Sequence, residues 1–178
     1  MWHILKFLIV LAGLVRTDSA QAQGTLQFIA TLTGTNEVPP NTDPTVGNGA
    51  FSLDGNILNF EVLVPAETFI SLRAFIQGPA GLGTNGPVIF DLGQPSFIGG
   101  SPPYYSFFSP PFGPLGAGPF TLSDSQVNDL MSGLWYVNVT SAFEPNGQLR
   151  GQIFVVPEPS GISLILFGVG IFAWGKLK

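Results

Sequence analysis

The chain has 178 residues, 10% of them charged and 12% aromatic, with 23 glycines, 16 prolines and no cysteine. The lack of cysteine excludes disulfides, thiol nucleophiles and cysteine-ligated metals, and the single histidine, His3, leaves no imidazole base or metal ligand beyond the first residues. The central residues carry two arginines against nine carboxylates, a net charge of −7, which excludes nucleic acid as a partner.

The N-terminus has the pattern of a secretory signal peptide. Lys6 precedes an apolar run, residues 7–15, that is too short to span a bilayer. Ala20 and Ala22 then supply the small-x-small site that signal peptidase accepts. We therefore expect a signal helix within residues 1–22, cleavage after Ala22 and export of the body. An uncleaved N-terminal anchor is the alternative.

Residues 23–155 alternate short strand patterns with turn residues, which predicts one all-β domain. Period-two alternation predicts a buried face in the strand 57–64 and another in the strand 70–77. About seven strands at this spacing predict a single β-sandwich or Greek-key barrel. The expected strands are 26–33, 50–53, 57–64, 70–77, 88–92, 134–141 and 148–155, with hairpin turns at Asp54-Gly55-Asn56 and Asn146-Gly147.

Residues 93–119 interleave prolines with aromatic residues, which predicts an irregular loop. Aromatic rings offer flat apolar area, so this loop is a candidate binding surface for polysaccharide or a matrix protein; the alternative is a lid that packs onto the domain. The four candidate residues are Tyr104, Tyr105, Phe107 and Phe108. One short helix is expected over 123–132, with Ser123 as its N-cap.

The last residues form a three-part tail: Val156-Pro157-Glu158-Pro159-Ser160, an apolar run over 161–175, and two terminal lysines. The run would rise roughly 22 Å as a helix, short of the ~30 Å hydrocarbon core, but snorkelling lysines can absorb the difference. We expect a transmembrane helix over 161–175 with the body on the extracytoplasmic side. The tail, 156–178, resembles the PEP-CTERM sorting signal. That resemblance implies recognition and processing by an exosortase, a membrane transpeptidase.

Three patches of the body resemble the CHRD domain, named from chordin. They are residues 30–40 (ATLTGTNEVPP), Gly78-Pro79-Ala80-Gly81 followed by Asn85-Gly86-Pro87-Val88, and residues 135–139 (WYVNV) continuing through 146–152 (NGQLRGQ). The resemblance implies an all-β domain, similar to immunoglobulin-like or Cu,Zn superoxide dismutase-like sandwiches. The family's usual histidines are replaced by Phe75, Gln77 and Thr140, which speaks against a metal.

Several polar residues keep two interpretations. Residues 36–40 are a binding loop or a stiff exit turn. Arg150 pairs with Glu37 or Glu144, or bonds loop carbonyls. Asp43, Asn48, Asp54 and Asp91 are a calcium site or ordinary turn residues. A carboxylate-dependent, carbohydrate-active enzyme would draw its acid pair from Glu37, Glu61, Glu67 and Glu144, although nothing in the sequence brings two of them together.

Taken together, these patterns predict a non-enzymatic exported protein without cofactor or metal. We expect it to be anchored in the membrane first and then delivered to the cell surface, the matrix or the medium after tail processing. A permanently anchored envelope protein is the alternative.

Overall fold

The computed structural model describes residues 24–66, 71–109 and 117–157, and this part of the chain is built almost entirely of strands. The elements are β1 (Leu26–Thr33), η2 (Gly34–Asn36), β2 (Val46–Asp54), β3 (Ile57–Pro65), β4 (Arg73–Gln77), β5 (Val88–Asp91), β6 (Ser96–Ile98), β7 (Tyr104–Phe108), β8 (Phe120–Thr121), α2 (Asp124–Met131), β9 (Tyr136–Thr140), β10 (Leu149–Gln152) and β11 (Phe154–Val155). The predicted all-β class is confirmed.

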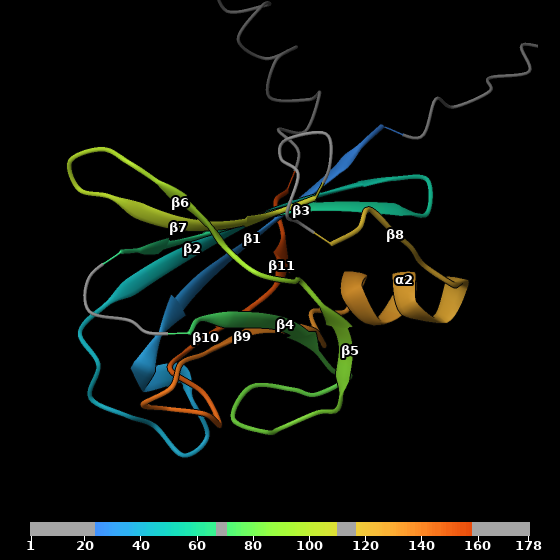
Figure 1. Ribbon diagram of the computed structural model, residues 1–178. Coiled ribbons are helices and arrows are strands. Elements are labelled where there is room, and N and C mark those ends of the chain that lie inside the picture. The colour runs from blue at the N-terminus through green and yellow to red at the C-terminus, as the bar shows by residue number, and fades with distance from the viewer. Residues whose placement is uncertain (1–23, 67–70, 110–116, 158–178) are drawn as a thin grey trace, which may run out of the picture.

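One continuous sheet bends back on itself to make two facing layers. The strand order is β5-β4-β9-β10-β1-β2-β3-β7-β6, while β11 also pairs with β1 and β8 with β3. Figure 1 shows β1, β2, β3, β7 and β6 in one layer, β10, β9, β4 and β5 in the other, and α2 beside the open side. The predicted sandwich therefore takes the form of a curled sheet whose layers are joined through the β1–β10 pair.

The core lies between the two layers and follows the alternation read in the sequence. Leu58, Phe60, Val62 and Val64 of β3 are all buried, as are Ala74 and Ile76 of β4. Side chains of a strand alternate between its faces, so every second residue of β1 and β2 joins them. The opposite face of β1 carries Gln27, Ile29 and Thr31 and remains exposed.

The predicted turn and helix signals are confirmed. Gly55 adopts a φ of 59° in the β2–β3 hairpin, the left-handed conformation that glycine tolerates best. Helix α2 starts after Ser123, whose side chain accepts a hydrogen bond from the Gln126 backbone while the Gln126 side chain accepts one from the Ser123 backbone. The helix ends before Gly133, where φ is 67°.

The prediction of an irregular loop over 93–119 was wrong for its central part. β6 and β7 form an antiparallel hairpin there, and β7 pairs with β3 along five residues. The prolines do not interrupt these strands: Pro95 precedes β6, and Pro102 and Pro103 lie between β6 and β7. β6 is an edge strand, so only one of its sides forms ladder hydrogen bonds, and prolines beside such a strand are tolerated.

The last predicted strand, 148–155, is divided in two. β10 pairs with β9 throughout, whereas Phe154 and Val155 of β11 pair with Ile29 and Phe28 of β1. Between them Ile153 is fully buried, and its backbone N–H donates to the Trp135 carbonyl. Finally, the Val156 N–H donates to the Gln27 carbonyl at 2.7 Å.

The predicted signal helix (1–22) and transmembrane helix (161–175) lie outside the described residues. Within residues 24–66, 71–109 and 117–157, no helix has the length and hydrophobicity needed to cross a bilayer.

Candidate functional site

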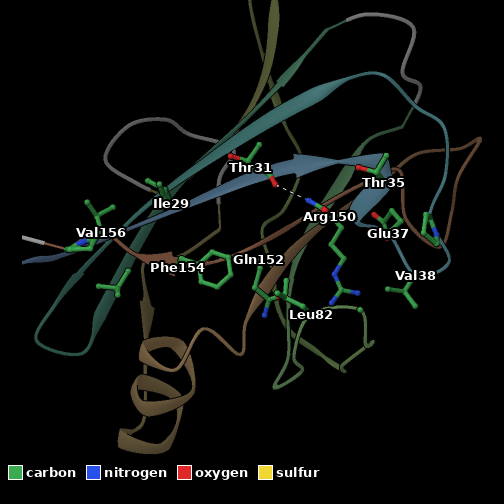
Figure 2. A pocket seen from close by; sticks show the side chains of 15 residues that line it. Ile29, Thr31, Thr35, Glu37, Val38, Leu82, Arg150, Gln152, Phe154 and Val156 are labelled. Atoms are coloured by element: carbon green, nitrogen blue, oxygen red, sulfur yellow. Dashed lines mark hydrogen bonds between the residues drawn. The ribbon is translucent and has the colours of Figure 1, made fainter.

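An open groove of about 740 Å³ lies on the outer face of β1, β10 and β11 (Figure 2). Its floor comes from these strands. One wall is the segment that follows β1, and the other is the loop between β4 and β5. The groove is lined by Ile29, Thr31, Thr35, Asn36, Glu37, Val38, Pro40, Leu82, Gly83, Arg150, Gln152, Phe154, Val155, Val156 and Pro157.

Strand alternation explains why the floor presents these side chains. Arg150, Gln152 and Phe154 are two residues apart and point away from the core, while Leu149 and Ile153 point into it. Across the strand pair, Thr33 lies opposite Arg150 and Ile29 opposite Phe154. The floor is thus charged at one end and apolar at the other.

Arg150 is 2% exposed and ties the β4–β5 loop to the sheet. Its two terminal nitrogens donate to the Thr84 carbonyl at 2.6 Å and to the Asn85 side-chain oxygen at 2.9 Å. Its guanidinium carbon lies 3.6 Å from the centroid of the Tyr136 ring. Because stacked guanidinium groups keep their in-plane donors free, one side chain satisfies both contacts.

The same loop is held at two more points, Gly86 and Ala80, by side chains that also bond neighbouring segments. Tyr136 accepts a hydrogen bond from the Gly86 N–H and donates to the Gln77 side chain. The Gln152 amide nitrogen donates to the Ala80 carbonyl at 3.0 Å and to the Gly133 carbonyl at 2.6 Å. These bonds fix the loop as a wall of the groove.

The two walls contact one another. The Asn85 side chain donates to the Val38 carbonyl at 3.1 Å. The segment after β1 is also bonded to the β9–β10 turn. Asn41 donates to the carbonyls of Gly147 and Gln148, at 3.2 and 3.0 Å, and the Gln148 amide donates to Asp43. Residues 36–40 are the exit from β1 and also part of the groove, because four of them line it.

Glu37 follows η2 and is 5% exposed, although it is an ionisable residue. Its carboxylate packs against Gly147, where a β-carbon would collide with it. Burial raises the pKa of Glu37 to about 7, although the nearby Arg150 charge opposes this shift and the Glu144 charge reinforces it. Oε1 of Glu37 is buried and has no hydrogen-bond partner, and Oε1 of Gln152 shares this condition.

Of the two interpretations of Arg150, the bonding of loop oxygens is confirmed. Arg73–Asp91 is the one ion pair formed between residues that the structure describes, and it is exposed. Glu37 and Arg150 lie near enough for their charges to interact, yet they do not make a direct ion pair.

The three patches singled out in the sequence meet at this groove: residues 30–40, the loop from Gly78 to Val88, and the β9–β10 hairpin. The CHRD domain family matches residues 28–153, and the chain belongs to this family. No curated protein and no solved structure matches the chain.

The positions of the missing family histidines share one sheet face. Phe75 and Gln77 lie on β4 opposite Asn138 and Tyr136, and Thr140 lies further along β9. Phenylalanine offers no lone pair to a metal. Within the described residues, no group of three His, Cys, Asp or Glu residues could hold a metal ion. Two of the four calcium candidates bond other protein groups: Asp43 bonds Thr45 and Gln148, and Asp91 bonds Arg73 and Gly93.

The aromatic candidate residues do not form one exposed surface. Phe107 is fully buried in the core and Phe108 is 7% exposed, because β7 is a paired strand and not a loop. Tyr104 and Tyr105 are half-buried, and Tyr105 packs edge-on against the exposed Phe97 ring. For Phe107 and Phe108 the proposed surface is corrected; for Tyr104 and Tyr105 it stays a prediction.

The sorting and processing residues are only partly described. Val156 and Pro157 line one end of the groove. Glu158, Pro159 and Ser160, together with Ala20 and Ala22, lie outside the described residues. Among the candidate acids, Glu37 lines the groove, Glu144 and Glu61 are exposed elsewhere, and Glu67 lies outside the described residues.

Sequence reasoning did not find the groove as a site. One signal was present: Ile29 is an apolar residue on the otherwise polar face of β1, and it is 56% exposed. Its neighbours Phe154 and Leu82 are 49% and 76% exposed. These three side chains meet because β10 pairs with β9 whereas β11, directly after it, pairs with β1. No local sequence pattern indicates this change of partner.

Proposed function

We propose that this chain is a non-enzymatic, exported protein of the cell surface or extracellular matrix. Its signal peptide (1–22) directs export, and its PEP-CTERM tail (156–178) is recognised and processed by an exosortase-like transpeptidase. Before processing, the apolar run 161–175 anchors the protein with the β domain on the extracytoplasmic side.

The junction between domain and tail is the observation that carries this proposal. β11 ends at Val155, and the backbone bond from Val156 to Gln27 is followed at once by Pro157, which has no N–H to continue the pairing. The CHRD match ends at residue 153. Cleavage anywhere beyond Val156 would therefore remove none of the described strands, as a removable sorting tail requires.

The proposal is tested by following the protein in its native host with an antibody against the β domain. Glu158→Ala removes the one charge of the motif, and Glu144→Ala, an exposed acid in the β9–β10 turn, is the matched control. We expect Glu158→Ala to retain the protein in the membrane at full length while the control is processed normally. Equal processing of both variants and the wild type would contradict recognition of the motif.

One observation favours a second candidate, a carboxylate-dependent enzyme acting on carbohydrate. Glu37 combines a pKa of about 7 with a position in the groove, as a general acid would. The charge of Glu144 contributes to raising this pKa. Glu144 does not line the groove, however, so the pair lacks a shared reacting position. Release of reducing ends from neutral oligosaccharides by the wild type, lost in Glu37→Gln, would favour the enzyme.

A further inference from the structure

The groove has an unusual hydrogen-bond balance. Two of its donating side chains are already committed: the amide nitrogen of Gln152 and both terminal nitrogens of Arg150 bond oxygens of the surrounding segments. Two acceptors, Oε1 of Glu37 and Oε1 of Gln152, have no donor. A buried acceptor left unpaired is costly, so the groove favours a ligand that supplies donors.

This balance discriminates between classes of ligand. An extended peptide brings as many carbonyls as N–H groups, whereas the two buried polar atoms of the groove that lack a partner are both acceptors. An anion would face Glu37 and a domain of net charge −7. A cation would lie beside the buried Arg150. A hydroxyl group carries no charge and can turn to donate wherever an acceptor waits.

The remainder of the lining is apolar and open. Ile29, Leu82, Phe154 and Val155 are each more than a third exposed, and Figure 2 shows Phe154 and Leu82 on either side of Gln152. Exposed apolar side chains that surround buried polar groups are the usual composition of a small-molecule site. The C–H face of a sugar ring fits such a surface while its hydroxyls reach the acceptors.

We propose that this groove binds a neutral carbohydrate, with sugar hydroxyls donating to Glu37 and Gln152 and a ring face packing on Phe154 and Leu82. Glu37 lines the groove, and because the last torsion of a glutamate side chain is soft, a turn of its carboxyl can present an oxygen to a bound hydroxyl. This inference names a class of ligand for the β domain. It rests on the proposed function only for the place where the protein would meet that ligand.

The test is isothermal titration calorimetry on the purified full chain in detergent, independent of any sorting step. The probes are cellotetraose, maltotetraose, mannotetraose and the tetramer of N-acetylglucosamine, with spermidine and tetragalacturonate as charged comparisons. The variants are Leu82→Ser and Phe154→Ala, which change exposed side chains of the groove. Phe143→Ala is the matched control, because Phe143 is 66% exposed and does not line the groove.

We expect at least one neutral tetramer to bind with a stoichiometry of one. Phe154→Ala and Leu82→Ser should each weaken binding roughly threefold to tenfold, as expected for the loss of one apolar or aromatic contact, while Phe143→Ala changes nothing. The inference is overturned if no neutral tetramer binds, if a charged probe binds more tightly, or if the groove variants bind as the wild type does. Each of these results leaves the sorting proposal untouched.

Discussion

The guanidinium of Arg150 lies over the ring of Tyr136 while its terminal nitrogens bond Thr84 and Asn85, so one buried residue joins β10, β9 and the β4–β5 loop. The β4–β5 loop is far from the β9–β10 hairpin in the sequence, since Asn85 and Arg150 are 65 residues apart. Their contact accounts for a cation in the domain that is 2% exposed and has no direct ion-pair partner among the described residues. It also makes Arg150 the residue on which the groove's geometry depends most.

Replacing this residue should reveal its role. Arg150→Lys keeps the charge but cannot make the forked bonds or the flat stacking contact, so we expect a loss of about 2–3 kcal/mol in the free energy of unfolding. Urea denaturation followed by tryptophan fluorescence measures it. The control is Arg73→Lys, an exposed partner of Asp91, which should cost at most about 0.5 kcal/mol. Similar losses in both variants would show that Arg150 has no special structural role.

Gly147 should tolerate no side chain. An added β-carbon there would collide with the buried carboxylate of Glu37, which would have to shift to make room. We expect Gly147→Ala to lower the free energy of unfolding by about 1–3 kcal/mol through overpacking. At Gly81 a β-carbon would meet nothing within 4 Å, so Gly81→Ala is the control and should change stability by less than about 0.5 kcal/mol.

Glu37 should make stability depend on pH. Burial raises its pKa from the ordinary 4.5 to about 7. The charge of Arg150 lowers this pKa, and the charge of Glu144 raises it. Below pH 4.5 both the folded and unfolded states hold the proton. Between pH 4.5 and 7 the unfolded chain releases it first, so stability falls as pH rises and levels off above pH 7.

Comparison with Glu37→Gln isolates this effect from the other carboxylates. Between pH 4 and pH 8 the wild type should lose about 2–3 kcal/mol of unfolding free energy more than the variant does. Denaturant titrations at four or five pH values measure the difference. Parallel curves for the two proteins would mean that Glu37 titrates normally in the folded state.

Local patterns predicted the elements whose signals are local. The alternation in β3 and β4, the Gly55 turn and the Ser123 cap lie where the sequence indicated, because each depends on residues a few positions apart. The β6–β7 hairpin was missed because prolines at its boundaries were read as interruptions of its strands. The groove was missed because it depends on long-range register, in which Ile29 meets Phe154 and Asn85 meets Val38.

The most direct test of the proposed function is the intact mass of the protein recovered from native membranes and from the medium. The account predicts a species that begins at Gln23 and lacks the residues beyond the Val156–Ser160 motif, found outside the membrane fraction. A species that keeps Lys178 and occurs only in membranes would contradict tail processing and leave a permanently anchored envelope protein.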